Sequence, residues 1–250
     1  MNSRPLTGWR VLVPRGGTWG DRVAATLRRH GAQPVIAPLI NFAGADRPEL
    51  LAAALERLGA GAYDWLVVTS ATTVDVLMSA GAVIPDSTRV AAVGETTAGA
   101  MTASGYRVDF VPARDNSARG LVAEWPGTGG RVLVPQSDIA EPTLVDGLAA
   151  LGVDAEYVTA YRTVGVEVAP EIRDEVTTGL VRAILLSSGS VARQVQAQFS
   201  PLPEGTVVAA IGPRTAYDAR AAGLKVQVIA EQRSAESLID GLIDHVKELG

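Results

Sequence analysis

The sequence predicts an α/β protein with two similar open parallel sheets, and three observations support this fold class. Short β-branched runs alternate with helix-length segments along the 250 residues. Several of these runs are apolar almost throughout, which is typical of strands that helices cover on both faces. The order of the elements also repeats once at an offset of about 120 residues, which indicates an internal duplication.

The strands and helices are expected in the alternating order of a doubly wound fold. In the segment VAATLRRHG, Val23, Ala24 and Leu27 fall on one helical face, and Gly31 suits the position after the last turn. The predicted strands are residues 10–14, 33–40, 64–70, 89–94, 107–112, 131–135, 154–164, 183–188, 207–212 and 225–230.

The duplication rests on matched segments rather than on composition. RVLVP occurs at residues 10–14 and again at 131–135, and VAAVGETTA at 90–98 corresponds to VAAIGPRTA at 208–216. The alternative is that doubly wound chains resemble one another by chance. Matching order and nearly constant spacing over several elements argue against that alternative.

Composition excludes several classes of function. Apolar residues make up 47% of the chain, and the net charge of -5 without a basic block disfavours nucleic acid as a partner. The absence of cysteine excludes disulfides, thiolate zinc sites, iron–sulfur clusters and a cysteine nucleophile. The two histidines, His30 and His245, lie away from the hydroxyl motifs, so a hydrolase triad and a His-rich metal site are not expected.

The chain has no feature that would direct it to a membrane. No apolar run approaches the roughly 20 residues of a membrane helix, and the N-terminus lacks an apolar signal core. We therefore expect a cytoplasmic protein, and we expect it to be a monomer.

Hydroxyl residues follow two of the predicted strands, in VVTSATTV and in LLSSGSV. Such residues cap helices, and helix starts also attract anions, so each junction is either a cap or part of a binding site. Gly189 favours the second interpretation because it would let a ligand approach the backbone. The candidate residues are Thr69, Ser70, Ser187, Ser188, Gly189 and Ser190.

Two further strand ends carry a glycine turn followed by threonine. Gly94 with Thr97 and Gly212 with Thr215 suit either a helix cap or a cradle for an anion. The glycine-rich PRGGTWG after the first strand matches neither the dinucleotide nor the Walker spacing. Arg15 in this segment is either an ordinary exposed residue or a partner for a carboxylate.

Two long extended segments, 35–44 and 158–168, stand at corresponding points of the duplicated chain. They are expected to connect the two domains, with connectors at 39–42 and 159–167. Tyr161 would then lie where the domains meet, either as a packing residue or as a functional one.

The ordered set VLVPRGG, DWLVVTSATTVDVL, VAAVGETTA, VTAYRTV, AILLSSGSV and VAAIGPRTA resembles the uroporphyrinogen-III synthase family over about residues 9–243. The resemblance implies two flavodoxin-like domains joined by a two-stranded connector, with the substrate between them. One domain would comprise residues 1–38 and 168–250, and the other residues 43–158.

The resemblance also implies an activity. Enzymes of this family are hydro-lyases of heme biosynthesis. They cyclise the linear tetrapyrrole hydroxymethylbilane with loss of water and inversion of ring D, without a cofactor or metal. Tyr161 matches the family's tyrosine that helps the hydroxyl leave, and Thr215 matches a functional threonine. The hydroxyl loops of the family are matched by Thr69, Ser70, Ser187, Ser188 and Ser190, and Arg15 matches the arginine often found after the first strand.

This chain departs from the family pattern at a few positions. Thr72 stands where asparagine is frequent, Arg214 where threonine is common, and Gln136-Ser137 where Arg-Gly is frequent. Because the substrate is rich in carboxylates and the chain is acidic, binding is expected to depend on local donors such as helix N–H groups and hydroxyls.

Two other functions fit the same fold class. A two-lobed small-ligand binding or sensor module would bind without turnover, and a secretion signal or an added DNA-binding segment would favour it. A glycosyl or phosphoryl transferase would need a nucleotide fingerprint or a carboxylate–metal pair, and the sequence has neither.

Overall fold

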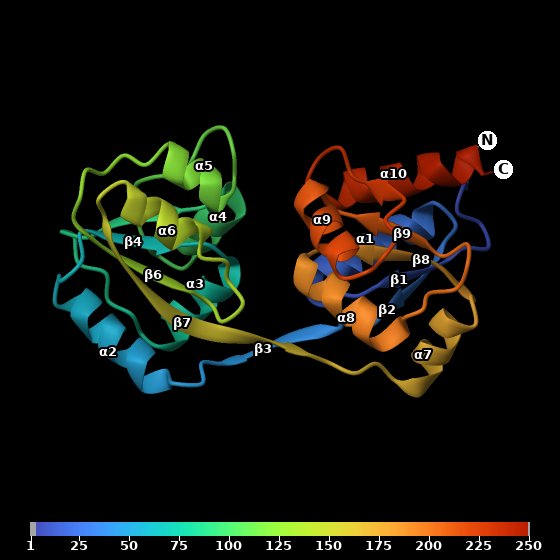
Figure 1. The fold of residues 1–250 in the computed structure, drawn as a ribbon, viewed down its shortest axis with the longest axis horizontal. Coiled ribbons are helices and arrows are strands. Elements are labelled where there is room, and N and C mark those ends of the chain that lie inside the picture. The colour runs from blue at the N-terminus through green and yellow to red at the C-terminus, as the bar shows by residue number, and fades with distance from the viewer. Residues whose placement is uncertain (1–3, 250) are drawn as a thin grey trace. The chain divides into compact units, whose positions relative to one another are not determined.

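A computed structural model describes residues 4–249 of the chain. Contacts divide the chain into two compact units (Figure 1). Unit 1 runs to Asn41 and resumes at Val164, and unit 2 is Phe42–Thr163. Each unit has its own five-stranded sheet. In the part of the chain that the structure describes, no helix is long and apolar enough to cross a membrane.

The sheet of unit 1 has the strand order β10-β9-β8-β1-β2, and its neighbouring strands are parallel. Alternate residues of β1 face opposite cores: Val11 packs with α1 and α10, and Leu12 packs with α7, α8 and α9. Helices therefore cover both faces, which explains the nearly continuous apolar strands. The elements are β1 (Arg10–Val13), α1 (Gly17–Arg29), β2 (Gln33–Ile36), α7 (Pro170–Thr177), β8 (Val181–Leu186), α8 (Gly189–Phe199), β9 (Val207–Ala210), α9 (Pro213–Ala221), β10 (Val228–Ile229) and α10 (Ala235–Glu248).

The sheet of unit 2 has the order β3-β7-β6-β4-β5, and the pairs β4–β5, β4–β6 and β6–β7 are parallel. Leu66 of β4 faces a core formed with α2, α3 and α4, and Val67 faces a core formed with α5 and α6. The elements are β3 (Ile40–Gly44), α2 (Pro48–Gly59), β4 (Trp65–Val68), α3 (Ala71–Ser79), β5 (Arg89–Ala92), α4 (Glu95–Ala103), α5 (Ala118–Ala123), β6 (Arg131–Ser137), α6 (Thr143–Ala150) and β7 (Asp154–Gly165).

Two predicted edge strands are shorter than the sequence indicates. Residues 107–112 form a single bridge, from Phe110 to Ala91, and residues 225–230 contain only the two-residue β10. In unit 2 the backbone N–H of Val90 donates to the Asp109 carboxylate at 2.8 Å instead of to a strand carbonyl. In unit 1 the N–H of Val208 donates to the Gln227 side chain, also at 2.8 Å. At both edges a side-chain acceptor therefore takes one strand N–H in place of a backbone carbonyl, beside the few backbone bonds that remain.

Candidate functional site

The carboxyl end of β4 brings a hydroxyl junction against a tyrosine. The strand is buried throughout, and Ser70 follows it in an extended conformation as the N-cap of α3, accepting the Thr73 N–H at 3.1 Å. The Ser70 Oγ also lies 3.1 Å from the Thr73 hydroxyl and 3.1 Å from the Tyr161 hydroxyl. Ser70 is therefore both a helix cap and a hydrogen-bond partner of Tyr161.

A β-bulge places Tyr161 at this junction. In the β6–β7 pairing, Gln136 lies opposite Thr159, but the next residue, Ser137, lies opposite Tyr161. Ala160 is the extra residue, so the usual alternation fails and both Ala160 and Tyr161 are buried. The Tyr161 ring packs edge-on against Phe42, with ring centroids 5.3 Å apart.

The environment of Tyr161 favours its neutral phenol. Burial raises the pKa of Tyr161 most strongly, the nearby Ser70 and Thr72 lower it, and the negative charge of Asp138 raises it. The net effect is a pKa above the ordinary tyrosine value. At neutral pH the Tyr161 hydroxyl therefore keeps its proton and can donate a hydrogen bond to a developing anion.

A second polar cluster lies beside Tyr161 and could not be found from the sequence motifs. Asp138 follows β6 and accepts hydrogen bonds from the Ser137 hydroxyl at 2.9 Å and from the Thr163 N–H at 3.0 Å. The Ser137 and Thr163 hydroxyls are 3.0 Å apart. The only signal of this cluster in the sequence is the polar run after β6, because its members come together through the β6–β7 register.

The corresponding junction in unit 1 is a cap of the same kind. Ser188 is the N-cap of α8, where its hydroxyl accepts the Val191 N–H at 3.3 Å and lies 2.9 Å from the Ser190 hydroxyl. Thr69 and Ser187 precede the two caps, and both are half-buried. The structure thus brings Ser70 to Tyr161 and Ser188 to Ser190, each pair within one unit.

Gly189 accommodates a side chain of its own unit. A Cβ at Gly189 would lie 2.3 Å from the Asp218 Oδ2. Asp218, on α9, is held by the Arg214 Nε, which donates to its other carboxylate oxygen at 3.0 Å. The absence of a side chain at Gly189 therefore lets α9 approach the start of α8.

The two glycine turns begin helices, with their threonines turned inward. Gly94 is the N-cap of α4 and Gly212 the N-cap of α9. Thr97 and Thr215 lie in the first turns of these helices, and each is buried. A Cβ added at Gly94 would contact the Asn116 side chain, whereas a Cβ added at Gly212 would have no neighbour within 4 Å.

Arg15 lies exposed between β1 and α1, with its guanidinium over the Trp19 ring at 5.4 Å. Among residues 4–249 it has no carboxylate partner, so its charge is available to an anion.

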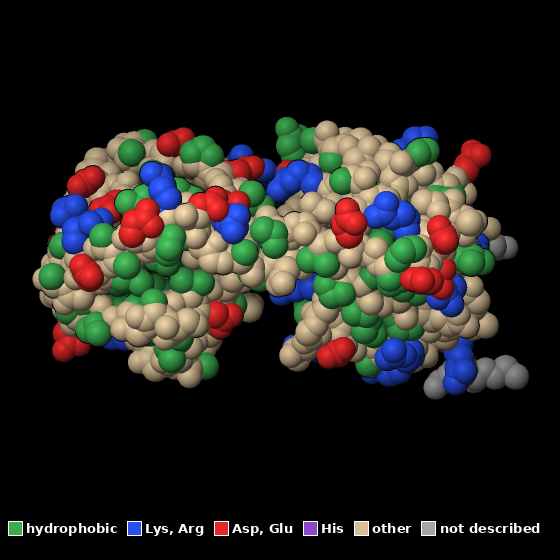
Figure 2. Space-filling view, turned by 90° about the horizontal axis from the view of Figure 1, so that it is seen from below, with side chains coloured by type: hydrophobic (Ala, Val, Ile, Leu, Met, Phe, Trp, Pro, Cys, Tyr) green, Lys and Arg blue, Asp and Glu red, His purple; other side chains and the backbone are tan. Residues whose placement is uncertain are grey.

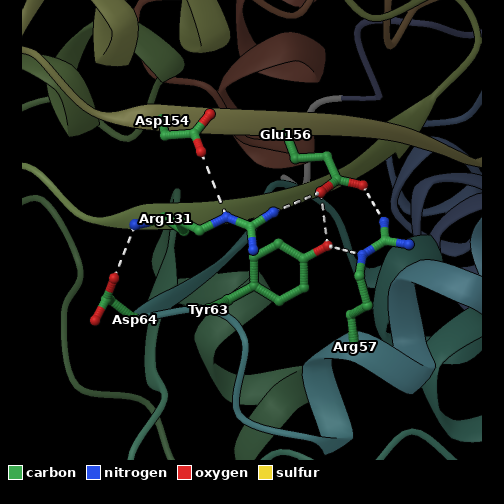
Figure 3. A network of polar contacts seen from close by, with 6 residues as sticks. All are labelled: Arg57, Tyr63, Asp64, Arg131, Asp154 and Glu156. Carbon is green, nitrogen blue, oxygen red and sulfur yellow. Dashed lines mark hydrogen bonds and ion pairs between the residues drawn. The ribbon is translucent and has the colours of Figure 1, made fainter.

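A charged network at the opposite end of the unit 2 strands has a structural explanation (Figure 3). Tyr63 donates to Glu156 at 2.7 Å, and Arg57 on α2 bonds to both of these residues. Arg131 lies over the Tyr63 ring and is 3.4 Å from Asp154. These groups join α2 to the first residues of β6 and β7, whereas Tyr161 and Ser70 lie toward the carboxyl ends of β7 and β4.

Comparison with known proteins identifies the family. The model of the family described as uroporphyrinogen-III synthase HemD matches residues 21–240, which is most of the chain. The chain belongs to this family. The resemblance found in the sequence motifs is therefore confirmed.

Two relatives carry names that agree with this assignment. The chain is 29% identical over 251 residues to the porphyrin biosynthesis protein HemD of Ruminiclostridium josui, covering 96% of this chain but 49% of that protein. It therefore spans about half the length of this relative. It is also 26% identical over 259 residues to the uroporphyrinogen-III synthase of Synechococcus elongatus, covering 96% of both chains.

Solved structures of the family share the fold. A mutant uroporphyrinogen III synthase from Thermus thermophilus superimposes with a TM-score of 0.67 at 20% identity, covering 97% of this chain and 100% of that chain. The Helicobacter pylori uroporphyrinogen-III synthetase gives a TM-score of 0.63 at 15% identity, covering 95% and 99%. The predicted fold class, α/β with two mostly parallel sheets, is confirmed.

Proposed function

We propose that this chain is a uroporphyrinogen-III synthase that cyclises hydroxymethylbilane with loss of water and inversion of ring D. Family membership and the names of both relatives support this activity. The reaction breaks the bond from carbon to the departing hydroxyl and closes the macrocycle by a new carbon–carbon bond. The hydroxyl leaves as water once it has received a proton, and the cyclised product gives up a proton in return.

One observation supports a place for this chemistry, namely the contact of 3.1 Å between the Tyr161 and Ser70 hydroxyls at the end of β4. Tyr161 is held neutral by burial, so its phenol can donate to the departing hydroxyl while Ser70 keeps it oriented. The resulting cation is delocalised over the pyrrole nitrogens of the substrate. The protein's main contribution is then to hold the linear tetrapyrrole so that ring closure with inversion of ring D is faster than spontaneous closure without inversion.

The substrate carboxylates require local donors because the protein itself carries a net charge of -5. Figure 2 shows Lys and Arg side chains interspersed with Asp and Glu on the face it presents. We assign carboxylate binding to helix starts and hydroxyls, each charge-assisted hydrogen bond contributing about 1.5–3 kcal/mol. The proposed binding residues are Arg15, Thr69, Ser70, Gly94, Thr97, Ser187, Ser188, Gly189, Ser190, Gly212 and Thr215.

The proposal also covers the location, the oligomeric state and the domain limits of the protein. We expect a cytoplasmic monomer that acts on its linear tetrapyrrole substrate without nucleic acid. The domain limits expected from the sequence, 1–38 with 168–250 and 43–158, remain part of this proposal, as does their origin by duplication. The caps at Ser70 and Ser188, and those at Ser117 and Ser234, support a common origin.

A coupled assay tests the activity. Hydroxymethylbilane is generated in place and incubated with the protein, and the oxidised porphyrin isomers are then separated. We expect type III in excess over the type I that forms without protein. If folded protein gives only type I, the synthase assignment is wrong.

A further inference from the structure

The loop after β6 holds the strand segment that carries Tyr161. The Asp138 N–H donates to the Tyr161 carbonyl at 3.0 Å. The Asp138 Oδ1 accepts the Thr163 N–H at 3.0 Å and the Ser137 hydroxyl at 2.9 Å. One residue thus bonds to β7 on both sides of Arg162, immediately after the bulge.

The same segment is held from the direction of β3. Arg162 donates to the Gly44 carbonyl at 3.0 Å and pairs with Asp46 at 2.9 Å. Residues 161–163 are therefore fixed by β6 through Asp138 and by the end of β3 through Arg162. Neither Asp138 nor Arg162 makes a hydrogen bond to the Tyr161 hydroxyl among the described residues.

The bulge explains why such fixation is needed. An extra residue interrupts the regular ladder and leaves the bulged strand locally without its usual pairing. The orientation of Tyr161, just after the bulge at Ala160, then depends on the contacts that replace the regular backbone hydrogen bonds between β6 and β7. Here the replacement is Asp138, whose backbone N–H donates to the Tyr161 carbonyl and whose carboxylate accepts the Thr163 N–H. The second bond ends on a charged acceptor and is stronger than a bond between neutral groups.

We infer that Asp138 is a positioning residue of the synthase, which fixes the bulge in β7 and thereby the direction of the Tyr161 hydroxyl. The inference rests on the proposed function of Tyr161. Its role differs from that of Ser70, because Asp138 acts through the backbone of Tyr161 and Thr163 rather than through the phenol.

Asp138 could instead act through its charge, and asparagine separates the two roles. Both side-chain hydrogen bonds end on the same oxygen, Oδ1. The amide oxygen in Asp138→Asn can accept both of them, so this variant keeps the bonds and removes the charge. Asp138→Ala removes the bonds and the charge together.

The first experiment compares these two variants with Asp154→Ala, a matched change at an exposed position of β7, the strand that carries Tyr161, where the carboxylate pairs with Arg131 at 3.4 Å. We expect Asp138→Ala to lower kcat for type III formation roughly 10- to 100-fold with KM little changed, because a displacement of about 1 Å can reduce a rate by that order. We expect Asp138→Asn to recover most of the lost rate and Asp154→Ala to match the parent. Equal losses in Asp138→Ala and Asp138→Asn would overturn the positioning role.

A double-mutant cycle then asks whether Asp138 acts through Tyr161. In the Tyr161→Phe background, Asp138→Ala is expected to lower the remaining rate much less than it does in the parent, because coupled residues are not additive. An undiminished effect in that background would mean that Asp138 acts elsewhere, and the inference would be wrong.

Amide exchange at Thr163 gives a readout that needs no turnover. We expect fast exchange in Asp138→Ala and protection in both the parent and Asp138→Asn. If the parent forms no type III isomer but this exchange pattern holds, the proposed function has failed while the fixation of the bulge stands. Unchanged exchange in Asp138→Ala would refute the fixation itself.

Discussion

The contact between Ser70 and Tyr161 yields a prediction that can be calculated from the structure. Ser70→Ala removes an N-cap, which costs about 1 kcal/mol, and a hydrogen bond to Tyr161, which contributes about 1 kcal/mol more. Tyr161→Phe removes only the second of these. The double variant should therefore be less destabilised than the sum of the single variants by about 1 kcal/mol.

The measurement must report on unit 2 alone, because a chain of two units need not unfold in one step. Amide exchange of peptides from β4 and α3 at increasing urea gives the opening free energy of this unit. The parent, Ser70→Ala, Tyr161→Phe and the double variant complete the cycle.

Ser117 provides the matched control. It caps α5 in the same unit by accepting the Gly120 N–H at 3.2 Å, and none of the described residues bonds to both Ser117 and the Tyr161 side chain. Ser117→Ala and Tyr161→Phe should therefore be additive within about 0.5 kcal/mol. If the Ser70 cycle is equally additive, the contact does not stabilise the fold, and the idea that Ser70 orients Tyr161 loses its physical basis.

Three further predictions follow from contacts described above. Tyr161→Phe should lower the rate of type III formation by no more than about 10²–10⁴-fold, as measured by separating the porphyrin isomers. Complete inactivity of a folded variant would refute a mechanism that depends chiefly on substrate positioning. Burial raises the pKa of Tyr161, so the stability that the neutral phenol contributes is complete below the unfolded pKa of about 10 and is lost as pH rises through the folded pKa. The free energy of unfolding should therefore fall less steeply with alkaline pH in Tyr161→Phe than in the parent. Identical pH profiles of stability for the two proteins would contradict this. Gly189→Ala should lower the melting temperature because the new Cβ displaces Asp218, whereas Gly99→Ala, at an exposed position of α4 with no neighbour within 4 Å, should stabilise the protein by about 0.5–1 kcal/mol and raise the melting temperature. Calorimetry of the two variants tests this, and a Gly189→Ala protein as stable as the parent would argue against the close approach of α9.

Sequence reasoning succeeded where a local pattern determines the structure. β4 is buried throughout and β8 is buried from Ala183 to Leu186, so their apolar runs identify them. The caps at Ser70 and Ser188 follow from a hydroxyl at a strand-to-helix junction. These features need only a few neighbouring residues.

The remaining features depend on partners distant in the sequence. The shortened edge at residues 107–112 results from the Asp109 carboxylate taking the Val90 N–H. The bulge is a property of the register between β6 and β7, and the consecutive apolar pair Ala160-Tyr161 is its only local sign. The cluster of Asp138 with Thr163 exists because of that register, so no motif in either segment could identify it.

The placement of β1 between β2 and β8 has a consequence for biosynthesis. At about 5–20 residues per second, β8 emerges from the ribosome on the order of ten seconds after β2. The whole of unit 2, Phe42–Thr163, has been synthesised by then, although it begins later in the chain. The usual order of folding, with the N-terminal domain first, is therefore reversed. During this interval the apolar β1 lacks its neighbour β8, and a nascent chain arrested once Thr163 has left the ribosome should resist protease only within unit 2.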